Sequence, residues 1–215
     1  MTSIKPKQLI VIGDSSVYGW GDFEGGGWCS RLSRHWMTSN NNSIIYQLGI
    51  RGDGLENVAQ RWRSEWKCRG ELRRNVPGGI LLAVGINDTA RIGREDGRPQ
   101  LSTDAFKFGL EALLKKMKKE TFVMVLGLNP VNEKSMPFAK CLWYSNKACS
   151  TYERLIEESC LEHDVPFLPT YQEMSSNPSL NNWIMQDGIH LNSSGHNWIF
   201  QKLLEWKSLN NWVNS

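Results

Sequence analysis

Short apolar runs alternate with longer amphipathic segments along almost the whole chain, and this alternation limits the possible folds more than any other feature of the sequence. Five runs are apolar at nearly every position and end in turn residues; they span residues 8–13, 43–49, 79–85, 122–128 and 165–169. Parallel strands that helices cover on both faces are typically apolar throughout. The runs therefore predict five strands of a parallel sheet.

The segments between these runs have the spacing of helices. Apolar residues recur every three or four positions in residues 27–37, 55–68 and 103–120, in part of 141–163, and in 193–206. Right-handed crossovers between parallel strands place helices on both faces of the sheet. We therefore predict an α/β fold, a three-layer α/β/α sandwich around a five-stranded parallel sheet.

Composition indicates an ordinary globular protein. Of the 215 residues, 40% are hydrophobic and 22% are charged. No linker rich in proline, serine or one type of charge divides the chain, so we expect residues 1–215 to form a single domain. The formal net charge is only +3 and the charges are dispersed, which predicts no nucleic-acid partner.

The cysteines and the N-terminal segment bear on the cellular compartment. Five cysteines form no CxxC pair, which argues against a disulfide framework or a zinc knuckle and favours reduced thiols. The first apolar run stops at Gly13, so it is shorter than the core of a signal peptide and far shorter than a membrane span. We expect a cytoplasmic protein with no integral membrane segment.

Polar turns follow the strands and precede the last helix. They read GDSS at 13–16, GIRGDG at 49–54, GINDTAR at 85–91 and DGIHLNSSGH at 187–196. In open parallel sheets, ligands bind at the carboxyl ends of the strands, where these turns would meet. Together the turns contain a hydroxyl nucleophile, a base with an acid to orient it, and donors for an oxyanion, which are the parts of an acyl-transfer site.

Ser15 and His190 are the predicted nucleophile and base. A serine hydroxyl attacks well only when a neighbouring base takes its proton, and a neutral imidazole suits this at pH 7. Asp187 lies three residues before His190, close enough to hold one ring nitrogen while the other faces the serine. Asp14 is expected to organise the turn. The other histidines are expected to lie on the surface or to be structural: His35, His163 and His196.

Small turn residues supply candidate donors for the oxyanion. Gly52 allows close backbone approach, Asn87 offers a side-chain amide, and the backbone N–H of Ser15 is a third donor. Each of these residues also has an ordinary explanation, a positive-φ turn for Gly52 and an Asx turn for Asn87.

The four turns, in this order and approximate spacing, resemble the four blocks of the SGNH hydrolases, also called GDSL-type esterases and lipases. The resemblance runs from about residue 8 to 206. It implies a flavodoxin-like sandwich that needs no metal or cofactor and cleaves carboxylic esters or thioesters, including lipid acyl groups and acetyl groups on carbohydrates. It also implies the Ser15, Asp187 and His190 triad and an oxyanion hole of Ser15, Gly52 and Asn87. The chain departs from the usual blocks at Ser16, and the second block is variable at Leu48 and Gly49.

The predicted function is a serine esterase of the lipase, esterase or thioesterase type that hydrolyses a small-molecule acyl ester through an acyl-enzyme on Ser15, with a carbohydrate O-acetylesterase as the alternative. A metal-dependent phosphoesterase would need more ligands than His190 and its neighbours supply. A flavodoxin-like binding module without catalysis is the third possibility. Trp20, Trp183 and residues 89–101 are expected to shape the substrate site, whereas Arg91 is expected to be an ordinary surface arginine.

Overall fold

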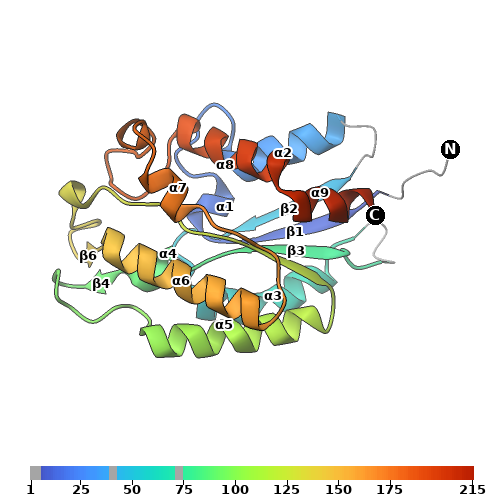
Figure 1. The fold of residues 1–215 in the computed structure, drawn as a ribbon, viewed down its shortest axis with the longest axis horizontal. Helices are drawn as coiled ribbons and strands as arrows, with labels where there is room; N and C mark the ends of the chain where they lie inside the picture. The colour runs from blue at the N-terminus through green and yellow to red at the C-terminus, as the bar shows by residue number, and fades with distance from the viewer. Residues whose placement is uncertain (1–5, 39–42, 71–74) are drawn as a thin grey trace.

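The five predicted strands form one parallel sheet in the computed structural model, which describes residues 6–38, 43–70 and 75–215 (Figure 1). The predicted domain also includes 1–5, 39–42 and 71–74, which lie outside the described residues. The strand order is β2-β1-β3-β5-β7, and every neighbouring pair is parallel, which confirms the predicted α/β fold. The strands are β1 (Gln8–Gly13), β2 (Ile44–Gly49), β3 (Gly79–Ala83), β5 (Phe122–Leu126) and β7 (Phe167–Leu168).

Helices cover both faces of this sheet (Figure 1). On one face lie α3 (Leu55–Lys67), α5 (Thr103–Lys118) and α6 (Asn146–Glu162). On the other lie α2 (Gly27–Thr38), α8 (Ser193–Glu205) and α9 (Lys207–Asn214). No helix in the described part of the chain combines the length and the apolar character that crossing a bilayer requires.

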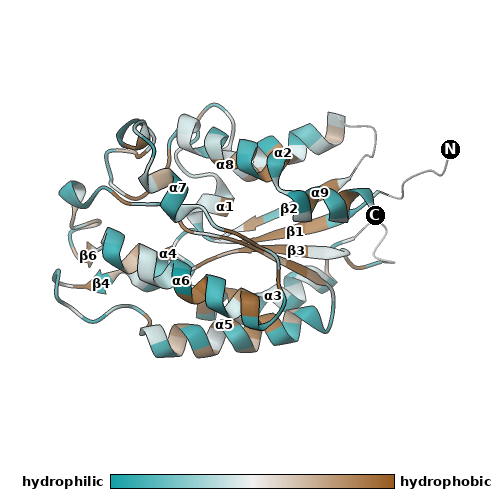
Figure 2. Ribbon diagram, in the orientation of Figure 1, coloured by the Kyte–Doolittle hydropathy of each residue, from teal (hydrophilic) through white to brown (hydrophobic). Residues whose placement is uncertain are grey.

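Alternate residues of β1, which lies between β2 and β3, supply both cores. Ile10 and Ile12 of β1 pack with α3, α5 and α6, while Leu9 and Val11 pack with α2, α8 and α9. All four side chains are at most 1% exposed, so each contributes about 1.5–3 kcal/mol of burial free energy. Figure 2 accordingly shows the central strands as hydrophobic, with polar residues on the surrounding helices.

Several short elements lie outside the predicted pattern. Five are helices or turns of three to five residues: α1 (Ser15–Tyr18), α4 (Ile86–Thr89), α7 (Tyr171–Ser175) and the 3₁₀ turns η2 (Glu133–Ser135) and η3 (Leu180–Asn182). An antiparallel pair joins β4 (Arg91–Ile92) to β6 (Leu142–Trp143). The strands β3, β5 and β7 are also shorter than their apolar runs, because the chain turns away from the sheet before each run ends.

Candidate active site

Strand β1 delivers Ser15 to the carboxyl edge of the sheet. A Cβ on Gly13 would lie 1.9 Å from the carbonyl oxygen of Ala83, so only glycine allows the ends of β1 and β3 to approach this closely. Asp14 then caps the short helix α1, because its Oδ1 accepts the backbone N–H of Ser16 at 2.8 Å. This agrees with the role expected for Asp14. Ser15, the first residue of α1, is 6% exposed.

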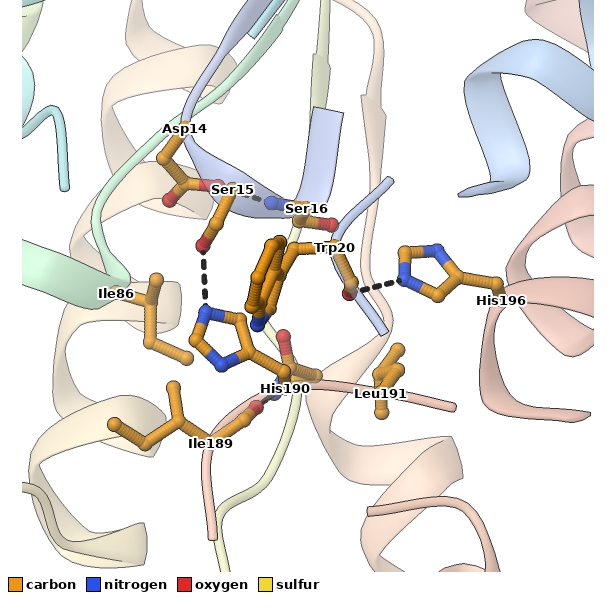
Figure 3. A pocket seen from close by; sticks show the side chains of 10 residues that line it. Asp14, Ser15, Ser16, Trp20, Ile86, Ile189, His190, Leu191 and His196 are labelled. Atoms are coloured by element: carbon orange, nitrogen blue, oxygen red, sulfur yellow. Dashed lines mark hydrogen bonds between the residues drawn. The ribbon is translucent and has the colours of Figure 1, made fainter. Parts of the chain in front are cut away.

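Ser15, His190 and Asp187 lie in hydrogen-bonded sequence. Nε2 of His190 is 3.0 Å from Oγ of Ser15, a contact that Figure 3 shows, and Nδ1 is 2.6 Å from Oδ2 of Asp187. The other oxygen of Asp187 accepts the backbone N–H groups of Ile189 and His190, both at 3.0 Å. The loop before α8 therefore holds the carboxylate and the imidazole in one fixed arrangement.

The environment keeps Asp187 ionised. Partial burial opposes its charge, but hydrogen bonds from the side chain of His190 and from the backbone of Ile189 and His190 hold its pKa below the usual value. An ionised carboxylate accepts a hydrogen bond from Nδ1–H, and this tautomer leaves the lone pair of Nε2 facing the Ser15 hydroxyl. The arrangement thus has the geometry of a nucleophile, a base and an orienting acid.

Gly52 and Asn87 lie at the same cavity as Ser15 and His190. Its volume is about 280 Å³, and its other lining residues are Arg51, Phe138, Tyr144 and Ile189. Gly52 has φ +85°, and no atom lies within 4 Å of the position that a Cβ would take. The turn after β2 therefore presents bare backbone to open space beside Ser15.

The side chain of Asn87 is held from three directions. Its Nδ2 donates to the carbonyl oxygen of Asp53 at 3.0 Å and makes a longer contact of 3.4 Å with Oδ2 of Asp14. The hydroxyl of Tyr144 donates to Oδ1 at 3.3 Å. Because Oδ1 accepts from the tyrosine and Nδ2 contacts Asp53 and Asp14, the orientation of the amide beside the cavity of Ser15 is fixed.

Two buried carboxyl groups, those of Asp14 and Asp88, lie next to Ser15 and Asn87 in the chain. Burial raises the pKa of Asp14 to about 6, although its hydrogen bond from Ser16 lowers it in part. Burial likewise raises the pKa of Asp88 to about 7, against the backbone hydrogen bond from Leu55. Both oxygens of Asp88 accept that N–H at 3.1 Å, which fixes the start of α3 relative to α4.

Comparison with known protein families identifies the family of this chain. The sequence profile described as the GDSL-like Lipase/Acylhydrolase family matches residues 11–198. The chain belongs to this family. It is therefore an acylhydrolase that acts on ester bonds, as the four polar turns predicted.

Solved structures of a lipase/acylhydrolase and of two esterases share the fold. A lipase/acylhydrolase from Enterococcus faecalis aligns with a TM-score of 0.71 at 16% identity, over 93% of this chain and 94% of that one. The acetylxylan esterase Axe2 from Geobacillus stearothermophilus gives 0.71 at 15% identity over 95% of both chains. The esterase EstA from Pseudoalteromonas sp. gives 0.70 at 14% identity, over 97% of this chain and 100% of that one. Comparison with curated proteins found no match.

Departures from the usual GDSL blocks have structural explanations. The hydroxyl of Ser16 accepts the indole N–H of the fully buried Trp28 at 2.9 Å, so it satisfies a donor that water cannot reach. A Cβ on Gly49 would lie 2.1 Å from the backbone nitrogen of Tyr18, so the close packing of α1 against the end of β2 requires glycine there. Leu48 is partly buried against the core.

The residues expected to flank the site fall into two groups. Trp20 lies beside the imidazole of His190, with ring centroids 6.3 Å apart (Figure 3). Trp183 instead packs against Trp198 at 5.7 Å and lines a different hollow. Arg91 donates to a backbone carbonyl of its own loop, and residues 89–101 do not line the 280 Å³ cavity.

His196 has the structural role that the sequence predicts. It is 1% exposed, and Nδ1 accepts the backbone N–H of Trp28 at 3.2 Å. Nε2 lies 3.1 Å from the carbonyl oxygen of Trp20 (Figure 3). Burial lowers the pKa of His196, consistent with a neutral ring that donates from Nε2. The residue fixes α8, α2 and the Trp20 loop to one another.

His35 is exposed, and His163 is only partly exposed. His163 joins Glu111 and Glu162 in a group whose ligand atoms lie within 4.8 Å of one another, between the middle of α5 and the C-terminal end of α6. None of these three side chains lines the cavity of Ser15. A role for them in the candidate active site is therefore not indicated.

Sequence reasoning missed the support that follows β5. The amide of Asn129 donates to the carbonyl of Ile189 at 3.0 Å, next to His190. The buried carboxylate of Glu153 accepts the backbone N–H groups of Leu128 and Tyr171, at 2.6 and 3.0 Å. The polar turn at the end of the fourth apolar run was the signal that would have found Asn129. Glu153 lies in an ordinary helical pattern and gave no signal.

Proposed function

We propose that the protein is a serine esterase that cleaves small carboxylic esters through an acyl-enzyme on Ser15. The observation that supports this most strongly is the contact sequence from Ser15 Oγ to His190 Nε2 at 3.0 Å and from His190 Nδ1 to Asp187 Oδ2 at 2.6 Å. Residues 175 positions apart meet in the geometry that proton transfer from a hydroxyl requires.

The reaction follows from these groups. Ser15 Oγ attacks the ester carbonyl while His190 takes its proton, and the carbonyl oxygen becomes an oxyanion facing the N–H groups of Ser15, Gly52 and Asn87. The tetrahedral intermediate collapses, and His190 gives the proton to the leaving alcohol. Water then attacks the acyl-enzyme by the same route in reverse and releases the acid. Asp187 orients the imidazole and stabilises its charged form throughout.

The cavity favours a short acyl group. Ligand pockets usually measure about 300–1,000 Å³, and the cavity that holds Ser15 is about 280 Å³. Phe138 and Tyr144 line it together with the oxyanion residues, so a long acyl chain would have to leave the cavity. We expect acetyl and similar esters to be better substrates than long-chain esters.

A carbohydrate O-acetylesterase is the second candidate. A groove of about 620 Å³ adjoins the site through Trp20 and contains the aromatic rings of Tyr18 and Phe23, which are 54% and 83% exposed. Exposed aromatic faces in a groove suit the apolar faces of sugar rings. The structurally similar Axe2 is described as an acetylxylan esterase, which supports placing this candidate second.

The test is hydrolysis of para-nitrophenyl esters of increasing chain length, a thioester and acetylated xylose by the wild type, Ser15→Ala and Ser16→Ala. We expect Ser15→Ala to abolish activity at an unchanged far-UV CD spectrum, and Ser16→Ala to retain it. A phosphonate probe should label the wild type and should not label Ser15→Ala. Full activity in Ser15→Ala would refute the proposal, and loss of wild-type activity in a chelator would favour the metal-dependent phosphoesterase.

We propose further that residues 1–215 act as one domain and that the protein works in the cytoplasm. The second point is supported by the five cysteines, all of which are free thiols. Fractionation of the source cells with an antibody to the protein tests it, and recovery outside the cytoplasm would contradict it.

A further inference from the structure

Arg51 lines the candidate catalytic cavity and carries a charge that no acidic side chain neutralises among the described residues. Its neighbours behave differently. Arg61 pairs with Asp53 at 2.8 Å, and Arg31 pairs with Asp22 at 2.7 Å. In the same part of the chain, Arg51 is exposed and donates no hydrogen bond to any residue that the structure describes. A free guanidinium beside the nucleophile needs an explanation.

The backbone of Arg51 is held in place from both sides. Just before it, the N–H of Ile50 donates to the carbonyl of Gly13 at 3.0 Å, and just after it, Gly52 adopts the positive φ described above. The N–H of Asp53 closes the turn onto Ile50 at 3.2 Å. The backbone of Arg51 is therefore held by a turn that is anchored at Gly13, two residues before Ser15.

Trp20 holds the side chain of Arg51 without using its hydrogen-bonding capacity. Cζ of Arg51 lies 3.5 Å from the centroid of the Trp20 ring, which is a cation–π contact. Such a contact engages the face of the guanidinium, whereas its five N–H donors point outward in its plane. The Trp20 backbone is itself fixed to Ser15 and His196, so the indole is a rigid platform. The arrangement preorganises a planar, charged donor group beside the catalytic cavity.

We propose that Arg51 binds a carboxylate of the substrate, carried on the acyl or the alcohol part close to the scissile ester. The inference rests on the proposed esterase function and names the class of ester it serves. A guanidinium pairs with a carboxylate through two parallel N–H···O bonds, a geometry that the donors of Arg51 leave open. Since Arg51 and Ser15 line the same 280 Å³ cavity, the anionic group and the ester carbonyl must lie within a few bonds of each other.

The experiment compares matched esters that differ in charge and by one methyl group. For the acyl side, the pair is para-nitrophenyl hydrogen adipate and its neutral methyl ester; for the alcohol side, para-acetoxybenzoate and methyl para-acetoxybenzoate. The values of kcat/KM are measured for the wild type, Arg51→Gln and Arg51→Lys at low and high salt. Arg94→Gln is the control, because Arg94 is an exposed arginine, 77% accessible and paired with Asp96, outside the cavity.

We expect the wild type to prefer the anionic member of at least one pair, and Arg51→Gln to lower this preference by about 10- to 100-fold, mainly through KM. Arg51→Lys should keep part of the preference, high salt should reduce it, and Arg94→Gln should leave it unchanged. The loss of the Trp20 contact would affect both members of a pair equally, so the ratio isolates the charge.

Equal ratios in the wild type and Arg51→Gln for both pairs would overturn the inference. Hydrolysis of the neutral members that depends on Ser15 would still support the esterase function in that case. If Ser15→Ala hydrolysed the neutral members as fast as the wild type, the esterase proposal itself would fail.

Discussion

Replacement of Asp187 by asparagine isolates the tautomer of His190. The substitution is nearly isosteric, and the amide oxygen can still accept the backbone N–H groups of Ile189 and His190, each at 3.0 Å. The amide NH₂ would then face Nδ1 of His190, 2.6 Å from the present oxygen. An NH₂ donor requires Nδ1 to accept, which moves the ring proton to Nε2, where it faces Ser15 and removes the general base.

The expected loss is large because the proton acceptor disappears while the fold stays. Wrong-tautomer variants of serine hydrolases lose roughly 10⁴-fold in kcat, which corresponds to about 5.5 kcal/mol of transition-state stabilisation. Asp187 is ionised in the folded protein because its hydrogen bonds from His190 and the backbone outweigh its partial burial. Asp187→Asn therefore also removes the negative charge that stabilises the imidazolium, and this second effect lowers kcat further.

The assay is the kcat for para-nitrophenyl acetate with the melting temperature as a fold control. Asp96→Asn, at an exposed carboxylate paired with Arg94, is the matched control and should keep wild-type kcat. Asp187→Ala should lose activity and also lower the melting temperature, because two backbone donors lose their acceptor. A loss of less than tenfold in a stably folded Asp187→Asn would show that this carboxylate does not set the tautomer and would refute the reasoning.

Three further predictions concern the support of the site. Ser16→Ala should lower the unfolding free energy by about 1–3 kcal/mol in urea titration, because the buried indole N–H of Trp28 loses its acceptor, with kcat retained; an unchanged stability would contradict this. Asn87→Ala should lower kcat by roughly 10²–10³-fold, because an oxyanion donor is lost. Tyr144→Phe should lower kcat only several-fold with KM unchanged, because the Tyr144 hydroxyl only orients Asn87. Equal losses of kcat in the two variants would contradict these separate roles. Burial raises the pKa of Glu153 from 4.5 to about 7, so the folded state binds the proton more tightly and loses stability as pH rises through that window. A tenfold change in proton affinity is about 1.4 kcal/mol, so between pH 4.5 and 8 the unfolding free energy of the wild type should fall by roughly 3 kcal/mol more than that of Glu153→Gln. Thermal unfolding of both proteins across this pH range measures the difference, and parallel pH profiles would refute the prediction.

The strands were predictable because each one lies in a run of residues that is apolar at nearly every position. β1 coincides with its predicted range, and β2 begins one residue later at Ile44. β7 is shortest relative to its prediction, with only Phe167 and Leu168 in the sheet, paired with Val125 and Leu126 of β5. Apolar character reports burial, and burial continues where the hydrogen-bonded ladder has already stopped.

Most of the candidate site was also predictable, but the residues that position it were not. Ser15, Gly52, Asn87 and His190 each follow a strand or precede a helix, so their meeting follows from the parallel topology. Tyr144 lies beside a two-residue strand, where neither periodicity nor turn chemistry gives a signal. Contacts of this kind depend on tertiary placement, which spacing along the chain does not encode.

The separation of Ser15 and His190 along the chain has a consequence for biosynthesis. The serine is synthesised 175 residues before its imidazole, and the two meet only when α8 has docked against α2 through His196 and Trp28. A growing polypeptide thus holds an inert hydroxyl until the segment that contains His190 and α8 has been synthesised. Turnover of an ester can accordingly report chains that extend through α8, whereas chains that stop before His190 remain inactive.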